Sequence, residues 1–173
     1  MNARKMKAPR TLEEFMVKAY EMEIEASERY ADFADAMETH NNREVADLFR
    51  KMAGIEGKHA TQIMAEMGWK VPPPPGKAKW EDFEGPETVA MDEVHYLMQP
   101  YHALTLALAS EERAERFFAR IAEAATVDSV RKAALELQEE EREHVELIKG
   151  WLAKVPKPDR NWADDPDPPR YTD

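Results

Sequence analysis

Two stretches of the sequence share one design: MAGIEGKHATQI at residues 52–63 and LQEEEREHVELI at residues 137–148. In each, a glutamate and a histidine three residues later (Glu56 and His59, Glu141 and His144) interrupt an apolar stripe with helical spacing. Residues three apart lie on the same face of a helix, so each pair points toward the side that its apolar neighbours would bury. Burying charged groups is costly unless they are compensated, and these two pairs therefore guide the interpretation of the whole chain.

Apolar residues recur with a helical period over most of the chain, which predicts four helices. The first begins after Thr11, a residue type that caps helix N-termini, and the second follows a turn at residues 40–42. The third begins between residues 87 and 91, with Pro100 as a kink or a later start, and the fourth follows Thr126. Short connections should make each consecutive pair an antiparallel hairpin. We therefore expect the fold class to be all-α, a four-helix bundle of two helical hairpins joined by a long crossover.

Proline and glycine are concentrated in two segments, at about residues 68–90 and from residue 156 onward. We expect a bundle domain over residues 1–155, containing the first segment as a crossover, and a Pro-rich C-terminal tail at residues 156–173. A helix of about 25 residues is roughly 37 Å long, and an extended chain covers that length in about 12 residues. The crossover can therefore run the length of the bundle and deliver the third helix parallel to the second. A disordered surface loop is the alternative.

Each predicted helix carries a glutamate on its apolar stripe: Glu23, Glu56, Glu111 and Glu141. The chain also repeats itself. Glu23 and Tyr30 match Glu111 and Phe118 in spacing, an alanine follows each of the two glutamates by three residues, and Glu-x-x-His follows on the next helix. A single glutamate on an apolar face is more often a boundary residue that reaches solvent. The repeat indicates instead that two similar hairpins bring four carboxylates and two imidazoles to one level of the core.

Such a cluster requires compensation, because four ionised glutamates in a low-dielectric interior repel one another and lose their hydration. Two divalent cations supply a charge of +4 against −4. Oxygen and nitrogen ligands without sulfur suit iron or manganese, and zinc can occupy the same kind of site. One Glu from each of two helices and Glu-x-x-His from the other two is the ligand pattern of di-iron and di-manganese carboxylate bundles. The sequence therefore predicts a dinuclear metal site.

With this ligand set, the sequence from Leu12 to Trp151 resembles the ferritin-like superfamily, and most closely its rubrerythrin and bacterioferritin branch. The resemblance implies two iron ions that react with peroxide or dioxygen, in a peroxidase-like or ferroxidase-like reaction with an external electron donor. It implies that Glu23 and Glu111 are terminal ligands, one for each ion. It also implies that Glu56 and Glu141 bridge the two ions and that His59 and His144 each cap one ion. It also implies that Tyr30 hydrogen-bonds a metal-bound carboxylate, which Phe118 cannot do.

The chain departs from rubrerythrins in two respects. It has no cysteine, so the rubredoxin-type electron relay of that family is missing. Ala114 stands where the family often has an additional movable glutamate; Glu115 either substitutes for it or is exposed. In the acidic run at residues 139–143, only Glu141 is expected to face inward. The main functional alternative is iron binding, storage or delivery; an interaction protein with a decayed site and an oxygenase for an organic substrate are further alternatives.

Composition excludes several other functions. The 173 residues include 35 acidic and 24 basic ones, for a formal net charge of −11, which disfavours binding to nucleic acids or anionic membranes. The absence of cysteine excludes disulfides, thiolate metal sites and cysteine nucleophiles. The basic first ten residues lack the apolar run of a signal peptide, and no stretch of 18 apolar residues exists. We expect a cytoplasmic protein that forms a homodimer or a higher homo-oligomer.

Overall fold

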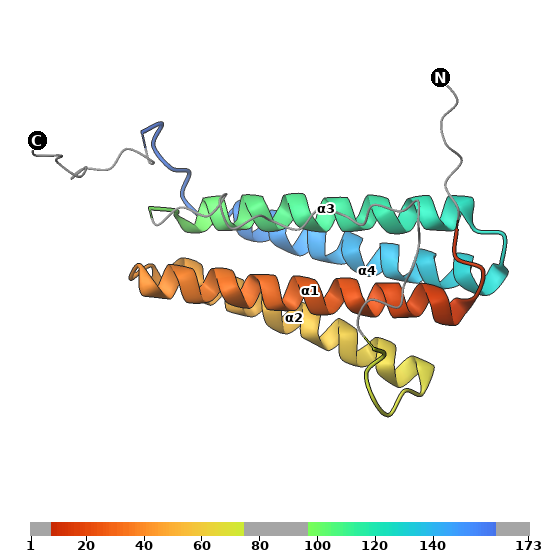
Figure 1. The fold of residues 1–173 in the computed structure, drawn as a ribbon. Coiled ribbons are helices and arrows are strands. Elements are labelled where there is room, and N and C mark those ends of the chain that lie inside the picture. The colour runs from red at the N-terminus through yellow and green to blue at the C-terminus, as the bar shows by residue number, and fades with distance from the viewer. Residues whose placement is uncertain (1–7, 75–96, 162–173) are drawn as a thin grey trace, which may run out of the picture.

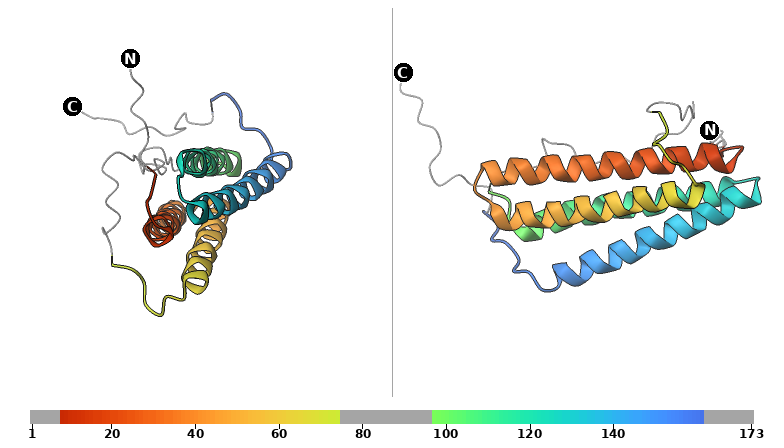
Figure 2. Two further views of the ribbon diagram at one scale, coloured as in Figure 1. Left: turned by 90° about the vertical axis from the view of Figure 1, so that its right-hand side faces the viewer. Right: turned by 90° about the horizontal axis from the view of Figure 1, so that it is seen from below.

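The computed structural model describes residues 8–74 and 97–161 and contains four long helices (Figure 1). Their bounds are α1 (Leu12–Thr39), α2 (Arg43–Met67), α3 (Pro100–Ala124) and α4 (Asp128–Leu152). Helix α1 packs along α2 and α3 packs along α4, and the two hairpins lie face to face (Figures 1 and 2). The predicted all-α four-helix bundle of two hairpins is confirmed.

Local interactions define the helix ends at the first hairpin. Thr11 caps α1 as predicted, since its side-chain oxygen accepts a hydrogen bond from the backbone N–H of Glu14 at 3.1 Å. Asn42 caps α2 through its side-chain oxygen, and its amide group donates to the carbonyl of Met98. Gly68 ends α2 in the left-handed conformation, with φ 68°, which glycine adopts without steric cost. Asn42 thus ties the first hairpin turn to the segment that precedes α3.

Helices α2 and α3 run parallel, because α2 ends at one end of the bundle and α3 begins at the other (Figure 1). The chain between them has to travel the length of the bundle, as the sequence predicted. Residues 97–99 are not helical, and α3 begins at Pro100. Proline favours the first position of a helix and disfavours helical geometry in the residue before it, which explains the late start. The earlier start at residues 87–91 lies outside the described residues, and any helix there does not continue into α3.

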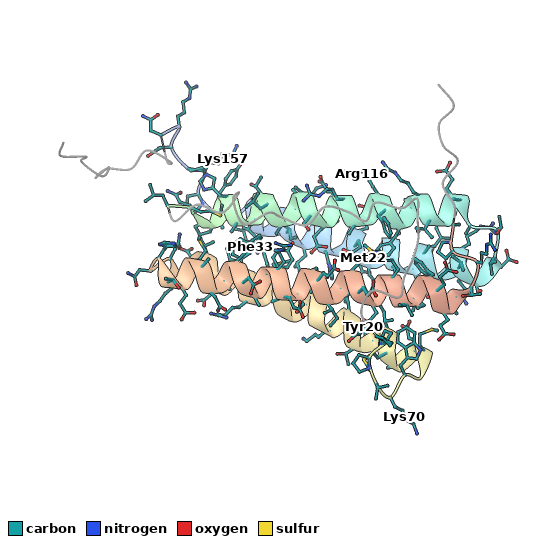
Figure 3. All side chains as sticks on the ribbon, viewed as in Figure 1. Tyr20, Met22, Phe33, Lys70, Arg116 and Lys157 are labelled. Atoms are coloured by element: carbon teal, nitrogen blue, oxygen red, sulfur yellow. The ribbon has the colours of Figure 1, made fainter. Side chains whose placement is uncertain are left out.

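The apolar core is divided into two clusters, one toward each end of the bundle. The first lies near the α1–α2 turn and includes Tyr30, Phe33 and Phe49, whereas the second lies near the α3–α4 turn and includes Phe15 and Phe118. Figure 3 shows Phe33 on the side of α1 that faces the second hairpin. The two hairpin turns lie at opposite ends (Figure 1), so a pseudo-two-fold axis across the bundle relates the two clusters.

Candidate metal centre

Between the two apolar clusters lie four glutamates, one from each helix. Their exposed fractions are only 2–3%, and they are the sole charged residues buried within residues 8–74 and 97–161: Glu23, Glu56, Glu111 and Glu141. His59 and His144 join them, with side chains 11% and 12% exposed. All six predicted site residues therefore come together at one level of the bundle. Their carboxylate oxygens and imidazole nitrogens form overlapping groups, within each of which the atoms lie within 4.8 Å of one another.

Close packing within the first hairpin places two of these glutamates side by side. The Ser27 hydroxyl donates a hydrogen bond of 2.9 Å to the carbonyl of Ala53, joining α1 to α2. Ser27 lies one turn after Glu23, and Ala53 lies just under one turn before Glu56. Gly57 faces the Ser27 side chain, which a Cβ atom at this position would approach to 3.5 Å. Small side chains at this crossing therefore let the two ligand-bearing helices approach closely.

The two histidines each face carboxylates from more than one helix. Nδ1 of His59 lies 3.6 Å from Oε1 of Glu23. Nδ1 of His144 lies 3.6 Å from Oε2 of Glu111, 3.7 Å from Oε2 of Glu141 and 4.0 Å from Oε1 of Glu56. Two donor atoms that each bind one ion at about 2.1 Å can lie no more than about 4.2 Å apart, so all of these pairs fit a shared metal ion.

The four-residue group contains Glu23, Glu56, His59 and Glu141, and a second group contains Glu56, Glu111 and His144. Glu56 belongs to both groups, and Glu141 belongs to the first while also facing His144. These two glutamates thus lie between the histidines of the two halves. The imidazole rings of His59 and His144 themselves stack, with centroids 4.5 Å apart and an interplanar angle of 19°.

Several buried polar atoms of the cluster lack a hydrogen-bond partner among the described residues. They are Nδ1 of His59, Nδ1 of His144, Oε1 of Glu111, Oε2 of Glu141 and the hydroxyl of Tyr30. Buried polar groups almost always have a partner, so several unpaired atoms at one level are unusual. Unpaired nitrogen and oxygen atoms at these separations are what a pair of cations would satisfy. The residues present therefore fit a dinuclear metal group.

Burial also perturbs the acid–base properties of the cluster. It raises the pKa of Glu23 and Glu56 well above the ordinary value of 4.5, helped by interactions with neighbouring carboxylates. Burial, reinforced by Glu141, raises the pKa of Glu111 to about 7. Burial alone would lower the pKa of His144, but the adjacent carboxylates of Glu111 and Glu141, 3.6 and 3.7 Å from its Nδ1, raise it to about 11. The metal-free cluster thus holds protons that two cations would displace.

Tyr30 is fully buried beside this cluster. Its ring stacks on Phe49, with centroids 6.0 Å apart. Burial raises the pKa of its hydroxyl well above 10.0, and the charges of Glu111 and Glu56 raise it further. The hydroxyl accordingly lies within electrostatic reach of the cluster, although the described structure gives it no hydrogen-bond partner. Its repeat counterpart Phe118 lies in the other apolar cluster and packs edge-on against Phe15.

Two further glutamates, Glu115 and Glu140, lie near the six site residues in the sequence but outside the groups of possible metal ligands. Glu115 pairs with Arg142 at 3.3 Å in a surface groove between α3 and α4, and it belongs to none of the metal-ligating groups. Only Glu141 of the acidic run was expected to face inward, but Glu140, whose side chain is 37% exposed, also approaches the site, with its Oε2 3.9 Å from Nδ1 of His59. Partial burial raises its pKa, as does the charge of Glu66. Its helical position, four residues before His144, was the available signal.

Comparisons with known proteins agree with this site. The rubrerythrin family model matches residues 14–97, which include nearly all of α1 and the whole of α2. A solved structure of an uncharacterized conserved protein from Magnetospirillum magnetotacticum MS-1 is 33% identical, with a TM-score of 0.64; the match covers 86% of this chain and 98% of that one. The chain contains a rubrerythrin-family domain. No curated protein matches it.

The fold is a ferritin-like four-helix bundle. Its buried Glu/His cluster is consistent with the dinuclear metal site typical of the rubrerythrin family. None of the helices within the described ranges combines the length and apolar character needed to cross a membrane.

Proposed function

We propose that the protein is a di-iron oxidoreductase that reacts with peroxide or dioxygen, in a rubrerythrin-like peroxidase or ferroxidase reaction. The observation that carries this proposal is the position of Glu56 and Glu141 between two histidine-containing groups. Glu23 with His59 would hold one ion and Glu111 with His144 the other, while Glu56 and Glu141, which face both halves, would be shared between the two ions. Manganese or zinc can bind the same ligands.

When bound, two ferrous ions would supply the two electrons, one from each ion, that together with two protons reduce hydrogen peroxide to two molecules of water. The four carboxylates balance the +4 charge of two divalent ions, so the loaded site is neutral and can remain buried. Apolar clusters on both sides of the site limit the access of water. The dry surroundings strengthen each electrostatic interaction between the carboxylates and a bound metal ion.

Tyr30 contributes a proton donor that stays protonated, because burial and neighbouring charges raise its pKa well above 10.0. In the loaded protein its hydroxyl donates a hydrogen bond to a ligand carboxylate, which fixes the orientation of that carboxylate. This role would account for a buried hydroxyl that has no hydrogen-bond partner among the described residues. Tyr30 is therefore a positioning residue rather than a redox group in this proposal.

Electrons for repeated turnover have to come from another molecule, since the chain has no cysteine with which to bind a rubredoxin-type iron. We assign this role to an external donor protein or small reductant, and we expect the protein to act as a homodimer or a higher homo-oligomer. Analytical ultracentrifugation of the purified full chain measures the oligomer and separates a small assembly from a ferritin-like shell.

The test is anaerobic loading with Fe²⁺ followed by stopped-flow mixing with hydrogen peroxide. We expect about two Fe²⁺ per chain and rapid oxidation of both in the wild-type protein. Glu141→Ala and Glu56→Ala should each reduce binding of both ions, because each removes a shared ligand. Unchanged iron binding and oxidation rates in both variants would contradict the assignment. Slow oxidation with retention of many more than two irons per chain would favour iron storage instead.

A further inference from the structure

The groove between α3 and α4 has a volume of about 440 Å³ and runs along the surface of the second hairpin. The nearly buried Val145 forms part of its lining, and three cations border it: Arg116 from α3, and Arg142 and Lys149 from α4. Three acids also line it, namely Glu112, Glu115 and Glu146. The charges of the groove therefore balance, and an acidic ligand meets less repulsion there than the net charge of −11 for the whole chain suggests.

The three cations keep N–H groups available for a further partner. Arg116 is exposed on the side of α3 that points away from α1 (Figure 3), and its side chain has no partner in the described part of the chain. Arg142 uses Nε and Nη1 to bind Glu115 and Glu139, which leaves its Nη2 group without a described partner. Lys149 has one exposed carboxylate neighbour, at 3.5 Å, and carries three N–H donors. All three side chains can therefore donate to additional carboxylates.

The sequence supplies an acidic segment, residues 162–173, which contains four aspartates, one arginine and three prolines and lies outside the described residues. Prolines favour the polyproline II conformation, with three residues per turn and about 3.1 Å per residue, so Asp164 and Asp167 would share one side, roughly 9 Å apart. Arg142 and Lys149 share one face of α4 and lie seven residues apart, or roughly 10 Å. The spacing of the two acids thus matches the spacing of the two cations.

The chain leaves the bundle where this segment can reach the groove. Just after α4, the backbone N–H of Val155 donates to the carbonyl of Trp151 at 3.2 Å, at the Lys149 end of the groove. Figures 1 and 2 show residues 153–161 passing the start of α3 on the side of the bundle away from α1 and α2. Asp164 follows Val155 by nine residues, which span up to about 30 Å when extended. That length suffices for the chain to turn back to Lys149.

We propose that the groove between α3 and α4 is a docking site for the acidic segment of the same chain. Asp164 pairs with Lys149, Asp167 pairs with Arg142, and Arg116 attracts the carboxylates from the opposite wall. The prolines restrict the segment before it docks, so docking loses less conformational entropy than it would for a flexible chain. The docked segment covers the outer surface of the hairpin that carries half of the metal ligands. This interaction does not depend on a bound metal.

The test measures a distance in the full chain by pulsed electron spin resonance, in EDTA. The chain has no cysteine, so nitroxide labels attach only at the introduced pair Leu135→Cys and Thr172→Cys. Leu135 is exposed on α4, beyond the end of the groove opposite to Lys149. A docked segment brings position 172 to the level of Leu135, which predicts a narrow distribution at about 20 Å. An undocked segment predicts a broad distribution centred near about 40 Å.

Charge variants of the labelled chain test the proposed contacts. Lys149→Glu should shift the distribution from about 20 Å toward about 40 Å, and 1 M NaCl should do the same by screening the ion pairs. Adding Asp164→Lys to Lys149→Glu should restore the short distance, because the pair is then reversed. Lys58→Glu is the matched control: it changes the net charge equally at an exposed position of α2, on the other hairpin, and should leave the distribution unchanged.

A broad distribution in the labelled parent chain, or equal effects of Lys149→Glu and Lys58→Glu, would overturn the docking site. Mixing the labelled chain with a tenfold excess of unlabelled chain before measurement distinguishes the occupant. A short distance that persists supports docking within one chain, whereas its loss would overturn that assignment and place the segment on a second copy. Circular dichroism of each variant verifies that the helices are retained. Because every measurement is made without metal, its result is independent of the proposed iron chemistry.

Discussion

The two hairpins carry the same three ligands but surround them with different residues. Glu140 approaches His59 in one half, whereas the residue at the matching position of the repeat, Ile55, is apolar and packs against the cluster that contains Tyr30. The hydroxyl of Tyr30, on the first hairpin, interacts electrostatically with Glu111 on the second, while its counterpart Phe118 has no polar group. The repeat therefore defines where two ions can bind, and the residues around the repeat make the two positions chemically distinct.

The largest expected difference between the two halves concerns the pH dependence of stability in the protein without metal. The pKa of Glu111 is raised from 4.5 to about 7, so its folded form keeps a proton that its unfolded form releases. The stability from this proton is complete below pH 4.5 and is lost as the pH rises to about 7, by about 3 kcal/mol. His144, raised from 6.5 to about 11, acts in the same direction between those two values.

Chemical denaturation in the presence of EDTA at pH 5 and pH 8 measures this effect. We expect the free energy of unfolding to be lower at pH 8, and Glu111→Gln to remove much of the difference because an amide does not titrate. Saturation with Zn²⁺ should reverse the trend, since metal ions compete with protons for the same atoms. A metal-free protein that is more stable at pH 8 than at pH 5 would contradict the raised pKa values.

The terminal carboxylates offer the next comparison. Glu23→Gln and Glu111→Gln each replace an anionic ligand of one ion with a neutral amide. Each variant should retain one Co²⁺ near its original affinity and bind the other about 100-fold more weakly. Equilibrium dialysis with increasing Co²⁺ gives both affinities. If Glu111→Gln weakened both ions equally, the assignment of Glu111 to one half would fail.

A smaller effect is expected for the aromatic pair. Tyr30→Phe removes a buried hydroxyl that lacks a partner in the metal-free structure, so metal-free stability should stay equal or rise by roughly 1 kcal/mol. In the Zn²⁺-loaded protein the same change should cost about 1 kcal/mol, because the hydroxyl then donates to a carboxylate. Denaturation curves of both proteins, recorded with Zn²⁺ and with EDTA, measure the effect of Tyr30→Phe on the metal-loaded and the metal-free protein separately. Phe118→Leu, which alters the matching ring without removing a polar group, should affect both states alike.

The six ligand positions were predictable because helical periodicity and an internal repeat both select them. The pairing of each histidine with particular carboxylates was not, since it depends on the register between hairpins and on side-chain rotamers. The acidic run at residues 139–143 is typical of a solvated face, so the run by itself does not predict that Glu140 approaches His59. Glu140 lies three residues after the buried Leu137 and four before His144, which places it next to the site.

The late start of α3 shows how a local rule and a periodic pattern compete. Apolar spacing continued upstream of Pro100, and the pattern alone favoured a longer helix. Proline lacks a backbone N–H and restricts the residue before it, so the helix begins at Pro100. His102 reinforces this boundary, because its Nδ1 accepts a hydrogen bond of 3.1 Å from the backbone N–H of Gln99.

The smallest expected effect concerns Glu115, the residue that sequence reasoning offered as an additional ligand. In the structure it pairs with Arg142 in the groove between α3 and α4, with its side chain 24% exposed and Arg142 52% exposed. Ion pairs at such exposed positions contribute about 0–1 kcal/mol. Glu115→Gln should therefore change the free energy of unfolding by less than about 1 kcal/mol and leave both Co²⁺ affinities within about twofold.

This prediction separates two ways in which a nearby acid can affect the site. Glu115 lies one helical turn after Glu111 and pairs with Arg142, whereas Oε2 of Glu140 lies 3.9 Å from Nδ1 of His59. If closeness of negative charge to the site were sufficient, Glu115→Gln and Glu140→Gln would weaken Co²⁺ binding alike. If closeness to a ligand nitrogen is required, only Glu140→Gln should do so. Measuring both Co²⁺ affinities of the two variants in the otherwise wild-type chain thus determines whether the two metal positions differ because Glu140 lies close to His59 or because of the acidic surroundings as a whole.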